Sequence, residues 1–209
     1  MNENIVRRNE LLGQTIIKGL EKRNMKGFYA ADKDEARRIA LSLIDEGASV
    51  TMGGCMSAHE IGLIDALNEG NYNYIDRDKL SNRKEAAMAA FGADVFLSSA
   101  NAMTQDGILV NIDGFGNRVA ATASGPDKVI FIVSMNKVCS DLDSAIKRAR
   151  NVAAPCNAQR FEVNTPCKKV GHCMDCTSPD CICGQILITR FSMLKDRIHV
   201  VLCGEDLGF

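Results

Sequence analysis

Five of the nine cysteines in this chain lie within the stretch CKKVGHCMDCTSPDCIC, residues 167–183. Their spacing is C-x5-C-x2-C-x4-C-x-C, in which only Cys173 and Cys176 have the two-residue separation that is typical of zinc knuckles and iron–sulfur loops. Clustered thiols in a reducing compartment favour metal or redox chemistry over a disulfide framework. We therefore predict a metal-binding loop here. An iron–sulfur cluster, zinc and free thiols are three open alternatives, because four thiolates suit either metal centre.

A second candidate site is TMGGCMSAHE, residues 51–60, where a β-type run meets two glycines and then a predicted helix. The N-terminal end of a helix directs backbone N–H groups toward an anion, and glycines let the backbone approach that anion closely. Ser57 and Glu60 have the spacing of a capping box, so the alternative interpretation is a tight turn before a capped helix. The candidate ligand-binding residues here are Gly53, Gly54, Ser57 and Glu60.

A third candidate site is SSANAMTQDGILVNIDGFGNR, residues 98–118, which is rich in polar residues for a strand end. Turn formation accounts for Asp113 and Asn117, but less well for Asn111, which interrupts an apolar run. Polar residues that converge on a loop over a rigid scaffold indicate a site. A carboxylate can act as a base or a metal ligand, and the planar fork of arginine binds carboxylate or phosphate. The candidate catalytic residues are Asp106, Asp113 and Arg118, and the candidate ligand-binding residues are Asn101, Thr104, Asn111, Gly114, Gly116 and Asn117.

The composition excludes several classes of function. The chain has 209 residues, 46% of them hydrophobic and 24% charged, with a formal net charge of −1, which is typical of a soluble globular protein. This near-neutral balance gives no electrostatic footprint for nucleic acid. The longest apolar runs, such as VIFIVSM at 129–135, are far shorter than a membrane span. The first residues have no apolar core of the kind a secretory leader needs, so we expect a cytoplasmic protein.

The first half of the chain alternates between strand and helix patterns. Such alternation predicts a mainly parallel sheet with helices on both faces, and ligands bind at the carboxyl ends of such strands. The expected strands are 27–32, 48–54, 71–76 and 93–99, and the expected helices are 3–23, 33–45, 57–68 and 83–91.

The second half departs from this alternation. Residues 107–112 and 118–123 are β-type runs joined by a glycine-rich turn, which predicts a β-hairpin. The continuous apolar run at 127–134 predicts a central buried strand, and 140–153 predicts a helix. We expect the closing strands, 185–191 and 197–203, to return to the main sheet. Residues 1–209 would then form one α/β domain, with 155–184 as an inserted cysteine-rich loop.

Several of these stretches together resemble the LUD (lactate utilization) domain family over nearly the whole chain. They are GGCMSAHEIGLIDAL, GPDKVIFIVSMNKVCSDLDSAIKRARNVAAPC, the closing HVVLCGEDLGF and, most specifically, NAMTQDGILVNIDGFGNRVAA. The resemblance implies a fold similar to ribose-5-phosphate isomerase, glucosamine-6-phosphate deaminase and the CoA-transferases. Members of that fold bind sugar phosphates, acyl-CoA or related anions at the strand ends.

The cysteine stretch resembles a motif of the single-domain branch of this family, TPC…GxCxDCxSPxxxC. That pattern maps onto Cys167, Cys173, Cys176 and Cys183, which become the candidate metal ligands, and it leaves Cys181 outside the set. Two positions depart from the family: Cys55 stands where we expect Ser, and Gln105 stands where Glu is frequent. We therefore assign no catalytic role to Gln105.

Some members of the family belong to systems that oxidise L-lactate to pyruvate with iron–sulfur partners. The resemblance therefore implies a protein that binds a small anionic metabolite, of the hydroxy-acid, acyl or sugar-phosphate type, as a subunit of an oxidoreductase. The alternative is a non-catalytic accessory protein that binds a metabolite or metal and docks onto an oxidoreductase or iron–sulfur partner. Whether the chain forms a homo-oligomer stays open. GFGN at 114–117 sits in a turn and is no nucleotide fingerprint.

Overall fold

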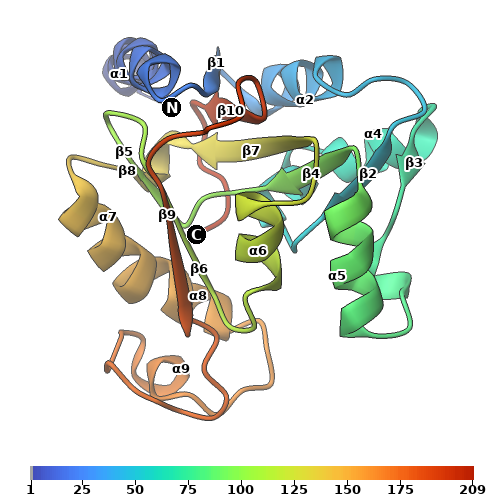
Figure 1. Cartoon of the computed structure of the whole chain (residues 1–209). Helices are drawn as coiled ribbons and strands as arrows, with labels where there is room; N and C mark the ends of the chain where they lie inside the picture. Colours follow the sequence, from blue (N-terminus) through green and yellow to red (C-terminus); the bar gives the residue numbers. More distant parts are fainter. Residues whose placement is uncertain (1) are drawn as a thin grey trace.

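The structure is a computed structural model that describes residues 2–209, and its centre is a six-stranded sheet (Figure 1). All pairings within this sheet are parallel, and the strand order is β1-β10-β7-β4-β2-β3. This result confirms the predicted parallel α/β fold. The strands are β1 (Lys26–Ala30), β2 (Ser49–Met52), β3 (Asn73–Tyr74), β4 (Val95–Ser98), β7 (Lys128–Ser134) and β10 (Ile198–Cys203).

The middle of the sheet is buried on both faces, and the alternation of side chains divides the core in two. In β7, Ile130 and Ile132 face one apolar cluster, while Val129, Phe131 and Val133 face the other. Strands with both faces covered are continuously apolar, which is why 127–134 predicted a central strand correctly. The first cluster packs under α2 (Lys33–Ser42), α3 (Met56–Glu60) and α4 (Leu63–Glu69); the second packs under α1 (Glu3–Lys22), α5 (Arg83–Gly92) and α6 (Asn117–Ala123).

A second, smaller sheet of mixed direction stands beside the main one. Its order is β8-β5-β6-β9, with β6 antiparallel to both neighbours and β5 parallel to β8. Helix α7 (Leu142–Arg148) and the π-helical turn Ala149–Ala153 pack on it and lead into α8 (Ala154–Ala158). The strands are β5 (Ala102–Thr104), β6 (Leu109–Asp113), β8 (Val138–Cys139) and β9 (Gln185–Thr189).

The predicted hairpin between 107–112 and 118–123 is wrong. The second run folds as helix α6, and β6 pairs instead with β5 and β9. Two features start the helix: Gly116 takes the left-handed conformation, with φ 85°, and the Asp113 carboxylate accepts the backbone N–H of Arg118 at 2.9 Å. Alanine then favours the helix over a strand. The expectation for the closing strands holds for β10 alone, because β9 joins the small sheet.

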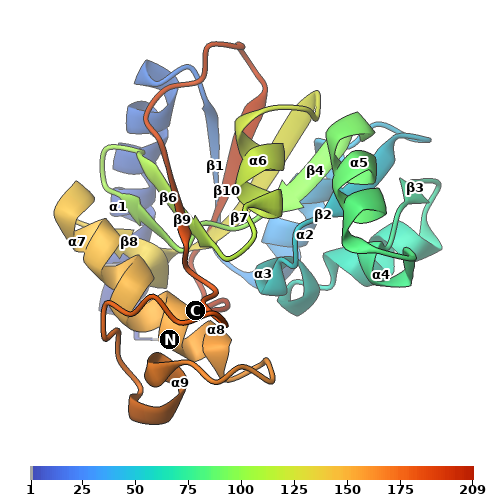
Figure 2. The same ribbon diagram turned by 60° about the horizontal axis from the view of Figure 1, so that its bottom comes forward.

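The cysteine-rich segment lies between α8 and β9, at one end of the molecule (Figures 1 and 2). It contains the short helix α9 (Pro166–Val170), which contacts α8. The assignment of 1–209 to one domain with 155–184 as an insertion stays a prediction. Across residues 2–209, no helix combines the length and the apolar character needed to cross a membrane.

Helix α1 packs on the turn between β5 and β6 through glycine. A Cβ atom added at Gly19 would lie 2.6 Å from the backbone oxygen of Asp106, whereas a Cβ at Gly92, also helical, would meet nothing within 4 Å. We predict that Gly19→Ala lowers the free energy of unfolding by about 1–3 kcal/mol through overpacking. The control Gly92→Ala should raise it by up to about 1 kcal/mol through helix propensity. Urea unfolding measures both, and equal effects would contradict this packing.

Candidate functional site

A cavity of about 890 Å³ opens at the carboxyl ends of the main-sheet strands. Gly53 and Gly54 follow β2, Ser99 follows β4, and Lys137 follows β7 by way of the 3₁₀ turn Met135–Lys137. The turn after β6 forms another wall. Ligands of open α/β sheets bind at this edge, so the cavity is the candidate functional site.

The second and third candidate segments meet in this cavity, although they are far apart in sequence. Eight of the residues proposed from the sequence line the cavity. Five of them contribute side chains, and three glycines contribute backbone. The lining residues among those expected from the sequence are Gly53, Gly54, Ser57, Asn101, Asp113, Gly114, Asn117 and Arg118.

Other expected residues lie outside the cavity. Asp106 pairs with Arg23 near the end of α1 and accepts a hydrogen bond from Thr104. The hydrogen bond from Thr104 has the largest effect and lowers the pKa of Asp106. Arg23 lowers it as well, and together they outweigh burial, which raises it. Asn111 is buried and donates to the carbonyl oxygen of Ser99 at 2.8 Å. Gly116 begins α6. Asp106, Asn111 and Gly116 therefore do not line the cavity.

The capping-box interpretation of Ser57 and Glu60 is wrong. The N-cap of α3 is Cys55, which makes no side-chain capping bond, and Glu60 instead accepts the backbone N–H of Gly208 at 2.9 Å. Because α3 has only five residues, we assign no anion site to its N-terminus. Cys55 itself is buried with 2% exposure, and burial raises the pKa of its thiol, so it packs as a small hydrophobic residue.

Arg118 is the most extensively held side chain of the cavity. Its guanidinium donates to the carbonyl oxygen of Ser99 at 3.1 Å, to Oδ1 of Asn101 at 3.0 Å and to the carbonyl oxygen of Ile112. All three acceptors are neutral. Guanidinium has five N–H donors, so two of them are left for a ligand.

Gly53 is required by the position of Arg118. A Cβ atom at Gly53 would lie 2.7 Å from Cγ and 2.9 Å from Cβ of Arg118. Glycine after β2 therefore makes room for the arginine stem. Packing and backbone conformation thus explain the double glycine, and no bound phosphate is needed to explain it. Gly53 leaves space for the side chain of Arg118, and Gly54 takes the left-handed conformation at φ 82°.

Asp113 has a structural role at the cavity wall. Its Oδ2 accepts the backbone N–H groups of Arg118 at 2.9 Å and Val119 at 3.3 Å, which caps α6. An acceptor that is engaged in this way orients Arg118 and holds the turn.

Lys137 was missed by the sequence analysis and is the most distinctive group of the site. Its side chain is buried, with 3% exposure, and Nζ lies 3.1 Å from Oγ of Ser99 and 3.3 Å from Oγ of Ser57. The two hydroxyls are themselves 3.3 Å apart. Its position shortly after the predicted central strand could have identified it, because ligands bind at the carboxyl ends of the strands in this architecture.

The electrostatic balance of the cavity is positive. No ion pair joins Lys137 or Arg118 to a carboxylate anywhere in the described range 2–209. Burial lowers the pKa of Lys137 to about 8, with smaller effects from Cys55 and Glu60, which raise it, and from Arg148 and Arg118, which lower it. The basic lining residues are Arg77, Arg83, Arg118, Lys137 and Arg160, and the acidic ones are Asp78, Asp113 and Glu162.

The cysteine loop adjoins the cavity. Ile182, between Cys181 and Cys183, lines its wall. A Cβ atom at Gly114 would lie 3.1 Å from Cα of Ile182 and 3.2 Å from the carbonyl oxygen of Cys181. Glycine at this position of the turn after β6 therefore lets the loop pack against it.

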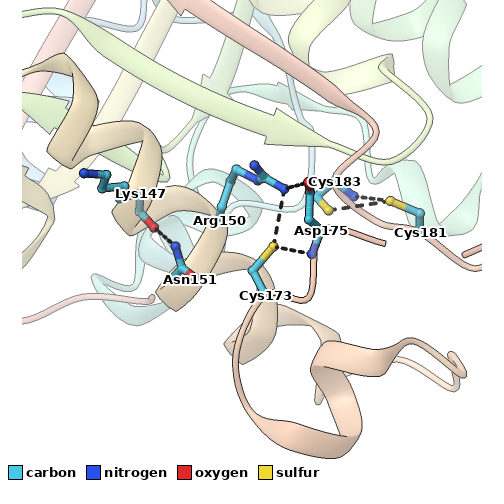
Figure 3. Close-up of polar contacts among 7 residues, drawn as sticks. All are labelled: Lys147, Arg150, Asn151, Cys173, Asp175, Cys181 and Cys183. Carbon is cyan, nitrogen blue, oxygen red and sulfur yellow. Dashed lines mark hydrogen bonds and ion pairs between the residues drawn. The ribbon is translucent and has the colours of Figure 1, made fainter. Parts of the chain in front are cut away.

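The thiols of this loop are partly gathered (Figure 3). The Sγ atoms of Cys181 and Cys183 are 3.5 Å apart, so Cys181, which the family pattern leaves out, lies beside a candidate ligand. Sγ of Cys173 accepts from Nη2 of Arg150 at 3.5 Å and from the backbone N–H of Asp175 at 3.4 Å. Within residues 2–209, no three His, Cys, Asp or Glu side chains converge as a metal site requires.

Burial and neighbouring thiols together set the protonation of Cys183. Burial raises its pKa to about 12, and the hydrogen bond and charge of Cys181 act in the same direction, as do Cys173 and Cys167. Cys183 is therefore a thiol at neutral pH. Cys167 is buried and contacts Oγ1 of Thr165 at 3.3 Å.

Comparison with known proteins gives one strong family match. A family model described as the LUD domain matches residues 13–203. A DUF162 family protein of Deinococcus radiodurans superposes with a TM-score of 0.54 at 9% identity, over 93% of this chain and 98% of that one, which shows a shared fold. Among curated proteins, none matches the chain significantly.

Two further crystal structures are less similar. They are eIF2B beta of Chaetomium thermophilum, with 18% identity over 54% of this chain and 44% of that one at a TM-score of 0.40, and the 5-methylthioribose 1-phosphate isomerase of Pyrococcus horikoshii OT3. The latter has 12% identity over 73% of this chain and 49% of that one, at a TM-score of 0.36. These similarities are too low to bear on function.

The buried position of Lys137 predicts a pH-dependent stability. The pKa falls from 10.5 to about 8 on folding, so between these values the unfolded chain binds more protons and stability rises with pH. Below about pH 8 the amine is charged in both states and its contribution is constant. Relative to Lys137→Met, the wild-type free energy of unfolding should therefore rise by about 1 kcal/mol per pH unit above this point.

Urea unfolding in reductant, at intervals from about pH 7 to about pH 10, measures this difference. The exposed Lys195, replaced by Met, is the matched control and should show no such trend. A difference between wild type and Lys137→Met that stays flat over the range would contradict a buried amine with a lowered pKa.

Proposed function

The chain belongs to the LUD domain family, and from this premise we propose that it binds a small anionic metabolite in the cavity at the strand ends. The metabolite would be of the hydroxy-acid, acyl or sugar-phosphate type. The finer proposal is that the protein acts as a subunit in the oxidation of lactate to pyruvate.

One observation supports this proposal above the others: buried Lys137 and half-buried Arg118 line the cavity and donate side-chain hydrogen bonds only to neutral oxygens. The hydrogen bonds of Arg118 end on carbonyl and amide oxygens, and those of Lys137 on hydroxyls. A charge that is buried without a counter-ion is costly. Asp113 acts on Arg118 and Glu60 on Lys137 without a direct ion pair. An anion that enters the cavity would offset the remaining cost at both residues.

The remaining donors suit a carboxylate or a phosphate. Arg118 keeps two N–H groups, and a protonated Lys137 keeps one beyond those directed at Ser57 and Ser99. The planar fork of arginine binds such anions through paired hydrogen bonds, while lysine acts as a point charge. Side chains, rather than a helix end, therefore form the anion-binding end of the cavity.

The size of the cavity bears on the ligand. A volume of about 890 Å³ lies near the upper end of the range for small-molecule sites and exceeds what a three-carbon acid fills. The lining also includes Arg83, which stacks on Phe115 with 3.4 Å from Cζ to the ring centroid, and Arg160 and Phe161. Acyl or phosphate-bearing ligands would use these further side chains.

The alternative of a non-catalytic accessory protein has its own support. Asp113, the candidate base nearest to the cavity, caps α6 through both backbone N–H groups, and Asp106 lies outside the cavity. Turnover of L-lactate with an artificial electron acceptor separates the two possibilities. Docking onto an oxidoreductase or iron–sulfur partner stays a prediction of this alternative.

Anion binding is tested by titration calorimetry with L-lactate, pyruvate and inorganic phosphate. We predict that Lys137→Met weakens binding by about 10- to 100-fold, because a hydrogen bond to a charged group contributes about 1.5–3 kcal/mol. Arg118→Lys should weaken it less. Lys195→Met, at an exposed site, should leave it unchanged. Binding that is equally strong in Lys137→Met, or absent for all three anions in the wild type, would contradict the proposal.

We further propose that the thiols of Cys167, Cys173, Cys176 and Cys183 bind a metal centre, with Cys181 as an additional thiol. Two contacts support this proposal. The Sγ atoms of Cys181 and Cys183 lie next to each other. Sγ of Cys173 accepts two N–H hydrogen bonds, which are of the kind that stabilise a thiolate ligand. An iron–sulfur cluster would supply electron transfer beside the cavity, whereas zinc would brace the loop.

Anaerobic purification, a visible absorption spectrum and metal analysis test this centre. We predict stoichiometric iron or zinc in the wild type, and its loss in Cys173→Ser and Cys183→Ser. Cys156→Ser is the matched control, because Cys156 is exposed on α8 and should keep the metal. Iron with a broad visible band favours the redox role, and zinc favours a structural clip. A metal-free protein with titratable thiols would eliminate the metal centre.

A further inference from the structure

We propose that Lys137 is a carbonyl-reactive amine that forms an imine with a 2-oxo acid held in the cavity. This inference rests on the proposed function, because it assumes that the cavity takes a small carboxylate. It goes further by naming the ligand class and a covalent step. Pyruvate is the smallest ketone of this class.

Three polar atoms form a compact triangle at the reactive position. Nζ of Lys137 lies 3.1 Å from Oγ of Ser99 and 3.3 Å from Oγ of Ser57, and the two hydroxyls are 3.3 Å apart. Each of the three residues borders the cavity and is at most 8% exposed. Hydroxyl groups both donate and accept, so this pair can hold a neutral amine as well as an ammonium group.

The surroundings allow the amine to be neutral. Burial is the main cause that lowers the pKa of Lys137, to about 8, and the charged or titratable groups around it are Cys55, Glu60, Arg148 and Arg118. At neutral pH an ordinary lysine is almost entirely protonated, whereas a pKa of about 8 leaves about a tenth of Lys137 as free amine at pH 7. Lysines that are desolvated in this way act as Schiff-base nucleophiles.

Space beside the amine is kept open by glycine. A Cβ atom at Gly208 would lie 3.1 Å from Nζ of Lys137 and 3.2 Å from Oγ of Ser57. Arg118 borders the same cavity and has two N–H groups left. A 2-oxo acid could therefore place its carboxylate on the guanidinium and its carbonyl carbon toward Nζ.

The step balances without an oxidant. The free electron pair on Nζ attacks the carbonyl carbon, and the carbonyl oxygen takes a proton to give a carbinolamine. The amine nitrogen then loses its second proton, the C–N double bond forms, and the hydroxyl group leaves as water. Ser57 and Ser99 are placed to carry these protons between nitrogen and oxygen. L-Lactate, which has no carbonyl group apart from its carboxylate, cannot react.

Reductive trapping tests the inference on the full-length chain. The protein is incubated with pyruvate, 2-oxobutyrate or glyoxylate and sodium cyanoborohydride, and intact mass spectrometry followed by peptide mapping locates the adduct. The expected product is one secondary amine on Lys137, with the mass of the oxo acid less one oxygen atom. L-Lactate should give none. Exposed Lys195 should remain unmodified while Lys137 is fully converted.

The variants separate this inference from the proposed function. Lys137→Arg keeps a positive charge but cannot form an imine, so it should give no adduct. Lys137→Met should also give no adduct and should bind phosphate about 10- to 100-fold more weakly. Thermal melting shows whether each variant is folded. Wild-type protein that binds phosphate or L-lactate but gives no adduct with any of the three oxo acids would overturn the imine and leave anion binding standing. An adduct that persists in Lys137→Arg would also overturn it.

Discussion

The guanidinium of Arg118 is the interaction on which the site depends, because it joins the two sheets. It reaches the carbonyl oxygen of Ser99, which follows β4 in the main sheet, and that of Ile112, which lies in β6 of the small sheet. Gly53 makes room for its stem, and Asp113 fixes its backbone. A single half-buried cation thus sets the position of three chain segments around one cavity.

The same geometry explains why the site is positive. Each hydrogen bond that holds Arg118 or Lys137 ends on a neutral oxygen. Carboxylates act on these cations without a direct ion pair, Asp113 on Arg118 and Glu60 on Lys137. A protein that needed these residues only for stability would be better served by a carboxylate or an apolar side chain at the same place. Retained charge in a cavity at the strand ends is instead what an anionic ligand requires.

The cysteine loop and the cavity form a continuous surface. Gly114 is both part of the turn that leads to Arg118 and the point against which Cys181 and Ile182 pack. The backbone of Cys181 and Ile182 is therefore within one contact of the cavity wall. This proximity relates the cysteine-rich stretch to the cavity, whereas in the sequence the two are separate motifs.

The sequence by itself determined the parallel sheet, because buried strands, helix caps and their alternation are local patterns. It failed at 118–123, where Val and Thr gave a β-type pattern, and only the cap from Asp113 together with Gly116 decided the helix. The local density of polar residues in the sequence also could not show which of them line the cavity. Asn101 and Arg118 do, whereas Asp106 contacts Arg23 at the end of α1. Lys137 meets Ser57 and Ser99 from 80 and 38 residues away. That triangle exists only once β2, β4 and β7 align their carboxyl ends, so only the tertiary structure decided it.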